Sequence, residues 1–336
     1  MSVPKTLDEA RSVEWLSAAL GVEVEEVVAG PIDDRVSTNA RVRLRFADGR
    51  ARDVWIKGYF TESGAVLRDA GVPEVHFYRD LASAAGVRTL RCLHAEVDPS
   101  TGFNVLVTED VGDGAVFPDG RQPCSPDQTA QSLAELATLH LATWANPRWA
   151  SVPWLASRME RYTVRRGVAE IAHNFESDRG RGVPASVRDP KRLFDSYLAL
   201  AELAAAADPW CVVHGDAHIR NVYLDPAGRP SFLDWQLVQR GPWYLDVGYH
   251  IATMLSVEDR RANEAALVAE YVDRLVAAGI ERPGAREVER ALCSGFVNGF
   301  YLWGITLRVE PEAIAALLER LGTAVDDHDA YRALQR

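Results

Sequence analysis

Alternating apolar and polar side chains near the N-terminus predict a β-hairpin. Apolar residues alternate with arginines over 41–46, the period of a strand with one buried face. A turn sequence, Ala-Asp-Gly, follows at 47–49, and a second strand is expected over 52–57. Another short apolar strand is expected over 103–108. The first third of the chain is therefore expected to form a sheet.

Helical spacing predicts the elements around this sheet. Apolar residues recur with a helical period over 7–20, and Thr6 with Glu9 forms a capping-box pattern at the start. Pro73 is expected to begin a second helix that runs to Leu81, because proline is tolerated in the first helical turn.

After residue 125 the strand signals become rare and helical patterns dominate. Ser125 followed by Pro126 predicts a helix start. Further helices are expected at about 191–206, 243–255, 258–278, 285–307 and 312–323. The exception is a small hairpin over 222–234, with a turn at 225–228. The arginine-rich stretch 158–188 is expected to be either a substrate loop or a solvated surface.

This order of elements predicts an α+β protein with two lobes. The 336 residues are enough for one large two-lobed unit. The acidic, glycine-containing stretch 109–114 is expected to connect a β-rich N-terminal lobe, residues 1–111, to a larger helical lobe, residues 112–336.

Composition and charge exclude several classes of protein. The net charge of −11 argues against nucleic-acid binding, which requires a surplus of clustered Lys and Arg. No apolar run approaches the ~18 residues of a membrane span. The first fifteen residues lack the apolar core of a secretory signal, and four scattered cysteines form no CxxC pair. We therefore expect a cytoplasmic protein; its oligomeric state is not predicted.

Side chains that can act as acids, bases or metal ligands are most concentrated in the segment 213–221, whose sequence is Val-His-Gly-Asp-Ala-His-Ile-Arg-Asn. Asn221 follows Asp216 by five positions, and Asp234 follows Asn221 by thirteen. These spacings match the catalytic loop and the metal-binding aspartate of kinases. Phosphoryl transfer needs an oriented acceptor hydroxyl and hard oxygen ligands for a metal. Asp216 is predicted to accept or orient the hydroxyl proton, and Asn221 and Asp234 to bind Mg²⁺.

The chain resembles the aminoglycoside phosphotransferase and choline kinase family of small-molecule kinases. The resemblance is carried by His214 to His218 with Asn221, by the Leu-Asp-Trp-Gln segment at 233–236, and by Asp246 within 241–249. It is most similar to the ecdysteroid-kinase-like branch. The resemblance implies a protein-kinase-like fold and ATP with Mg²⁺ as cofactors.

The N-terminal lobe holds the expected nucleotide-binding groups. Lys57 ends a predicted strand, where such kinases place the lysine that contacts phosphate, and Glu74 is its expected ion-pair partner, with Glu62 as the other candidate. The phosphate-covering loop is expected within 33–39. It has no glycine-rich motif, so Ser37 and Thr38 are the expected donors, although an ordinary polar turn explains them almost as well.

The adenine base is expected to meet main-chain groups of the segment 107–110, which includes Thr108 and Asp110. His214 is expected to support the catalytic loop by hydrogen bonding, and Asp246 to bond to the same loop. Both are therefore expected to be supporting residues.

Two alternatives remain beside the kinase. His214, Asp216 and His218 alternate, as the ligands of a metallohydrolase would on a strand, although Asn221 and Asp234 then have no role. A nucleotide-binding pseudokinase or scaffold is the other alternative.

The sequence thus predicts an ATP-dependent phosphotransferase acting on a hydroxyl of a small metabolite or natural product, without a nucleic-acid or membrane partner. It does not choose the acceptor. Tryptophans gather at 144–154, where they either fill the core or line an aromatic substrate pocket. An acidic pocket facing Asp216 would favour polycationic substrates, and an apolar one a flat alcohol.

Overall fold

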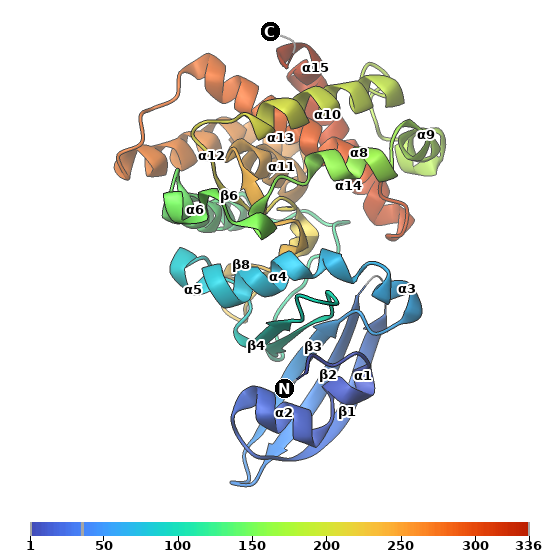
Figure 1. Cartoon of the computed structure of the whole chain (residues 1–336). Coiled ribbons are helices and arrows are strands. Elements are labelled where there is room, and N and C mark those ends of the chain that lie inside the picture. Colours follow the sequence, from blue (N-terminus) through green and yellow to red (C-terminus); the bar gives the residue numbers. More distant parts are fainter. Residues whose placement is uncertain (1, 35–36, 335–336) are drawn as a thin grey trace. The chain divides into compact units, whose positions relative to one another are not determined.

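The computed structural model describes residues 2–34 and 37–334, and the chain divides into two compact units (Figure 1). Unit 1 comprises Met1–Ala115 together with the short segment Leu233–Leu237. Unit 2 comprises Val116–Phe232 and Val238–Arg336. The fold is α+β, as predicted, with an antiparallel sheet in unit 1 and mostly helices in unit 2.

The sheet of unit 1 has five antiparallel strands in the order β1-β2-β3-β5-β4. The strands are β1 (Val24–Asp34), β2 (Thr38–Phe46), β3 (Ala51–Gly58), β4 (Cys92–Val97) and β5 (Asn104–Glu109). The predicted hairpin is confirmed as β2 and β3, and the predicted strand at 103–108 as β5. The register pairs Asn39 with Lys57 at the end of the hairpin.

Alternate residues of these strands form the core of unit 1. Val42, Leu44, Val54 and Ile56 are buried, and α2 packs on the same cluster through Leu16. In β1 only Val24 is buried, so this strand lacks the alternation that predicts strands and was not expected.

The predicted single helix over 7–20 is wrong, because the chain forms two helices there. The Thr6–Glu9 capping box is present and begins α1 (Leu7–Ala10). Ser12 then caps α2 (Val13–Leu20) by accepting a hydrogen bond from the N–H of Trp15. Ser12 thus begins a second helix inside the apolar pattern. The spacing of apolar residues alone does not reveal such a second start.

The predicted helix at Pro73 is confirmed, although it is built from three short pieces: α4 (Val72–His76), the π-helical turn η2 (Phe77–Leu81) and α5 (Ala82–Ala85). Before it lie α3 (Glu62–Ala65) and the 3₁₀ turn η1 (Arg68–Ala70).

Unit 2 confirms the predicted helices closely. They are α6 (Pro126–Thr143), α10 (Pro190–Ala205), α11 (Tyr244–Met254), α12 (Val257–Ala277), α13 (Ala285–Gly304) and α14 (Pro311–Asp327). The stretch 158–188 was expected to be a loop or surface, but it contains α8 (Met159–Arg165), α9 (Val168–Glu176) and the turn η4 (Asp178–Gly180). The remaining short helical pieces are α7 (Pro147–Ala150), η3 (Pro153–Leu155) and α15 (Ala330–Ala333).

Two small sheets interrupt the helices of unit 2. The predicted hairpin is confirmed as β7 (Val222–Leu224) with β8 (Pro230–Phe232). The other sheet pairs β6 (Cys211–Val213) with β9 (Gln239–Gly241) and was not predicted, because these short strands, unlike β7 and β8, are not joined by a turn sequence. The 3₁₀ turns η5 (Ile219–Asn221) and η6 (Trp235–Leu237) flank these strands.

Two glycines let α11 and α13 cross in direct contact. A Cβ on Gly248 would lie 2.6 Å from the carbonyl oxygen of Leu292, and one on Gly295 would lie 2.5 Å from that of Tyr244. Any larger residue at this crossing would push the helices apart. Among the described residues, no helix is long and apolar enough to cross a membrane.

Candidate active site

The segment 213–221, which contains Asp216 and Asn221, forms a loop that runs from the end of β6 to η5. Gly215 has a φ of +81°, a conformation that side chains rarely adopt, and this turn brings Asp216 out of the strand direction. The Nδ2 of Asn221 donates to the carbonyl oxygen of Asp216, at 2.9 Å, so the two ends of the loop are joined.

Asp246 of α11 anchors the start of this loop. Its Oδ2 accepts from the N–H of His214 at 2.7 Å, and its Oδ1 from the N–H of Gly215 at 2.9 Å. The fully buried His140 lies 3.1 Å from the same carboxylate through Nε2, and its Nδ1 lies 2.7 Å from the hydroxyl of Tyr271. This buried network fixes the loop backbone to α6, α11 and α12.

The carboxylate of Asp216 is held by three neighbours. The Tyr249 hydroxyl donates to Oδ1 at 3.1 Å, the Asn221 amide donates to Oδ2 at 3.2 Å, and the Nε2 of His218 lies 3.5 Å from Oδ2. Burial alone would raise the pKa of Asp216, but the interactions with His218 and His214 and the hydrogen bond from Tyr249 lower it below its usual value. Asp216 is therefore an ionised acceptor at neutral pH.

The two histidines of the loop turn one ring nitrogen to the backbone. The Nδ1 of His214 accepts from the N–H of Asp216 at 3.2 Å, and the Nδ1 of His218 accepts from the N–H of Arg220 at 3.1 Å. In the part of the chain that the structure describes, no group of three or more His, Cys, Asp or Glu side chains is arranged to hold a metal. The geometry does not support the metallohydrolase alternative.

His250 also supports the loop, and sequence reasoning missed it. Its Nδ1 lies 2.6 Å from the carbonyl oxygen of Ala217, and its Nε2 lies 2.6 Å from the hydroxyl of Ser132. Burial lowers its pKa to about 4, so the ring is neutral. Its position on α11, one turn after Asp246, is the only sequence signal that could have indicated it.

In unit 1, Lys57 lies between two carboxylates. Its Nζ is 2.7 Å from Oε2 of Glu74 on α4 and 3.0 Å from Oδ1 of Asp234. Burial opposes the charged form of Lys57, but Asp234 and Glu74 outweigh it and raise the pKa of Lys57 above its ordinary value. Glu74, and not Glu62, is the partner; Glu62 lies at the start of α3.

The segment 233–237 is held in unit 1 by its tryptophan. The indole of Trp235 stacks on Phe77, its Nε1 donates to the Thr89 hydroxyl at 2.9 Å, and its main-chain N–H donates to the Glu74 carboxylate. Asp234, with a φ of +62°, is thereby held beside Lys57.

The other expected nucleotide-binding residues lie on the same sheet. Ser37 and Thr38 are buried at the start of β2, and the Thr38 hydroxyl donates to Asp34. Residues 35 and 36 of the expected phosphate loop lie outside the described residues. Thr108 is buried in β5. The Asp110 carboxylate accepts from Arg41 at 2.9 Å and from Trp55 at 2.8 Å, so this side chain supports the sheet.

The chemistry of Asn221 and Asp234 fits a hard metal ion. The amide nitrogen of Asn221 donates hydrogen bonds to Asp216 within the loop. Its amide oxygen is then the atom that can coordinate a metal ion. Asp234 is about a third exposed and adds carboxylate oxygens. Oxygen donors of this kind suit Mg²⁺.

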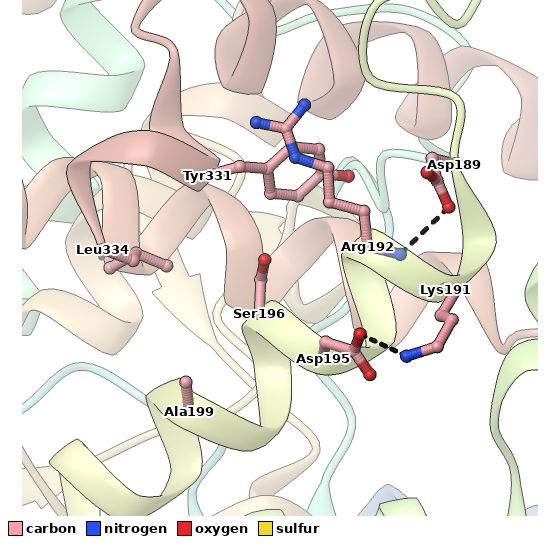
Figure 2. Close-up of a pocket in the computed structure, with 8 residues that line it drawn as sticks. All are labelled: Asp189, Lys191, Arg192, Asp195, Ser196, Ala199, Tyr331 and Leu334. Atoms are coloured by element: carbon pink, nitrogen blue, oxygen red, sulfur yellow. Dashed lines mark hydrogen bonds and ion pairs between the residues drawn. The ribbon is translucent and has the colours of Figure 1, made fainter.

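Of the tryptophans at 144–154, Trp149 is buried, and Trp144 and Trp154 are half-buried. Trp149 has the Arg148 guanidinium 4.6 Å from its ring centre and belongs to the core. A pocket of about 360 Å³ lies elsewhere in unit 2 and is lined by residues of α10 and by Tyr331 and Leu334 (Figure 2). None of the expected site residues lines it.

Comparison with known proteins defines the class. The model of the phosphotransferase enzyme family matches residues 2–288. The chain belongs to this family, which confirms the predicted family and the predicted class of enzyme, a phosphotransferase. The resemblance to the ecdysteroid-kinase-like branch stays a prediction.

Solved structures show the same fold. Choline kinase LicA from Streptococcus pneumoniae is 14% identical, with a TM-score of 0.50 over 94% of this chain and 97% of that chain. A choline/ethanolamine kinase family protein from Mesorhizobium loti is 16% identical, with a TM-score of 0.50 over 91% and 92%. No curated protein matches the sequence.

Proposed function

We propose that this phosphotransferase moves the γ-phosphoryl group of ATP to a hydroxyl of a small molecule, with Asp216 as the group that receives the proton. The observation that supports this most is the Asp216 carboxylate, which is ionised and oriented by Tyr249 and Asn221 in a loop anchored by Asp246. The acceptor oxygen forms a bond to phosphorus, ADP leaves, and the hydroxyl proton passes to Asp216.

Residues 1–111 are proposed as the nucleotide-binding lobe and 112–336 as the lobe that binds the acceptor. Lys57, oriented by Glu74, contacts the phosphates, and Ser37 and Thr38 donate to them. Main-chain groups near Thr108 and Asp110 meet the adenine. Bound Mg²⁺, with Asn221 and Asp234 as its ligands, supplies positive charge to the phosphates.

His214 and Asp246 are proposed as positioning residues, because both hydrogen-bond within the loop that presents Asp216. We place the enzyme in the cytoplasm, where ATP is available and where its four free cysteines would stay reduced. Its only proposed partner is the hydroxylated acceptor.

The test is to measure ADP release from Mg-ATP over a panel of hydroxylated compounds. We expect Asp216→Asn to lower kcat by roughly 10²–10⁴-fold with ATP affinity nearly unchanged, because general-base catalysis contributes about that much. Asp127→Asn, on the exposed first turn of α6, is the control. Full activity of the Asp216→Asn enzyme would contradict the proposal. Tight ATP binding by the parent protein without turnover of any compound would favour the pseudokinase.

A further inference from the structure

The start of α4 in unit 1 lies so close to two strands that there is no room for another side-chain atom. Gly71 precedes α4, and its carbonyl oxygen accepts from the N–H of Val75 at 3.1 Å. A Cβ on Gly71 would overlap Oδ1 of Asn104 on β5 and the ring of Tyr59, which follows β3. The φ of Gly71 is −81°, which any residue adopts. The close approach, and not the backbone conformation, therefore requires glycine here.

Asn104 ties the turn before α4 to the sheet. Its side chain is 4% exposed, and its Nδ2 donates to the carbonyl oxygens of Arg68 at 2.8 Å and of Gly102 at 2.9 Å. A side-chain amide has two protons and can make both bonds at once. The Arg68 carbonyl also accepts from the N–H of Gly71 at 3.0 Å. One oxygen atom thus joins Asn104 to the residue that begins α4.

The neighbouring residues strengthen the same attachment. The Nε of Arg68 donates to the carbonyl oxygen of Thr101 at 2.6 Å, and its guanidinium lies 4.9 Å from the ring centre of Phe103. A Cβ on Gly102 would lie 2.6 Å from Oδ1 of Asp69. The turn η1 is therefore bound at several points to the turn between β4 and β5, and Asn104 stands in the middle of an ordered junction.

This junction fixes the position of Glu74. Glu74 follows Gly71 by three positions, so both lie on the same side of α4. Its carboxylate is 2.7 Å from the Nζ of Lys57, which precedes Tyr59 by two positions. A displacement of α4 by about 1 Å would lengthen this contact beyond hydrogen-bonding distance. The Lys57–Glu74 pair thus depends on how closely Gly71 approaches the sheet.

We propose that Gly71 and Asn104 are positioning residues for the phosphate-binding lysine: together they set the depth of α4 against β3 and β5, and so hold Glu74 where it orients Lys57. They act through Glu74 and not by contact with substrate. This rests on the proposed function, because Lys57 is proposed there to contact the phosphates of ATP. A merely structural role would leave the pair intact in any folded variant, whereas a positioning role predicts that folded variants lose it.

The test measures Lys57 directly, by competitive labelling of the full chain with trace acetic anhydride, which reacts with the unprotonated amine. The chain has three lysines, at positions 5, 57 and 191, so mass spectrometry of peptides can follow each one. Lys191 on α10 of unit 2 is the internal reference. Asp234 and Glu74 keep Lys57 protonated against the effect of burial, so its labelling in the parent protein should be slow. Loss of the Glu74 contact should make it faster.

Two junction variants act by opposite means, because Gly71→Ala adds an atom and Asn104→Ala removes two hydrogen bonds. We expect each to raise the ratio of Lys57 to Lys191 labelling about threefold or more. Glu74→Gln removes the charge and should raise the ratio about tenfold or more. Calorimetry of Mg-ATP binding to the full chain should show about three- to tenfold weaker binding in all three variants, since the lysine that meets the phosphates is no longer oriented.

Gly284→Ala and Asn263→Ala are the matched controls in unit 2. A Cβ on Gly284 meets no atom within 4 Å, and the Nδ2 of Asn263 donates to the carbonyl oxygen of Asp259 at 2.8 Å. Both should leave the labelling ratio and Mg-ATP binding within about twofold of the parent. Thermal melts establish which variants are folded at the labelling temperature, and either junction variant alone is sufficient for the test.

A labelling ratio within about twofold of the parent in a folded junction variant would overturn the inference, whether or not Glu74→Gln raises it. An equal rise in Asn263→Ala would overturn it too, because general loosening of the chain would then explain the labelling. Failure of the proposed function gives a different result. The labelling ratio would rise as expected, but Glu74→Gln would bind Mg-ATP as tightly as the parent.

Discussion

The indole of Trp235 lies parallel to the ring of Phe77, with ring centres 3.7 Å apart and planes inclined by 12°. These residues are 158 positions apart in the sequence, yet both belong to unit 1. The stack holds the backbone on which Asp234 stands beside Lys57. The geometry of the proposed phosphate-binding groups therefore depends on a hydrophobic contact.

Truncating this stack should weaken unit 1. We expect Trp235→Ala to lower the free energy of unfolding by ~3–5 kcal/mol, because a fully buried ring is lost and a cavity remains. Urea denaturation checks this. Trp235→Phe keeps a ring but loses the N–H that bonds to Thr89, so its cost should be smaller, about 1–2 kcal/mol. Equal losses in the two variants would contradict the role given to the stack.

Tyr249→Phe should shift the pH profile of the enzyme. The Tyr249 hydroxyl helps to lower the pKa of Asp216, so its removal raises that pKa. Protonation of Asp216 then begins at a higher pH, and the acid limb of kcat/KM moves upward. We also expect kcat/KM at neutral pH to fall roughly tenfold. Tyr244→Phe, on the same helix, is the control and should leave the acid limb in place.

His250 should make the fold sensitive to acid. Its pKa is about 4 in the folded protein against 6.5 for the free side chain, so the unfolded chain binds the proton first as pH falls. Its stabilising contribution is present above pH 6.5 and is lost progressively toward pH 4, by about 2 kcal/mol between pH 7 and 5. Urea denaturation at both values measures it.

The matched variant for this effect is His250→Gln. It should be less stable than the parent at pH 7 but should lose less stability between pH 7 and 5, because its amide does not titrate. An unchanged pH dependence would show that other groups cause the acid sensitivity.

Gly295→Ala should disturb both stability and activity. An added Cβ would lie 2.7 Å from the Cα of Gly248, so α11 and α13 must separate, at a cost of ~1–3 kcal/mol or more. The helix α11 carries Tyr249, so kcat/KM should fall as well. Gly284→Ala, where a Cβ meets no atom within 4 Å, should be nearly neutral in thermal melts and in ADP release.

The sequence predicted the elements that carry a long period. The helices α10 to α14 follow their apolar spacing, and Ser125 with Pro126 marked the start of α6 because capping is a local property. Strands β6 and β9 have three residues each and, unlike β7 and β8, are not joined by a short turn that the sequence could signal. Their pairing is imposed by the surrounding helices, so only tertiary structure could reveal them.

The proposed site was predicted in part, for a related reason. Asp216, Asn221 and Asp234 stand at fixed spacings along the chain, and the Lys57–Glu74 pair follows from strand and helix order. His250 was missed, because its position one turn after Asp246 does not by itself show that its ring reaches Ala217 and Ser132.

Because the five residues Leu233–Leu237 belong to unit 1, the two units cannot be separated by a single cut in the chain. The chain leaves unit 1 after Ala115, returns for this segment and leaves again, so the covalent backbone passes between the two units three times. A fragment ending at Ala115 would contain Lys57 and Glu74 but neither Asp234 nor Trp235. Unit 1 therefore cannot be exchanged between relatives as one continuous stretch of gene; a chimaera must graft both pieces together.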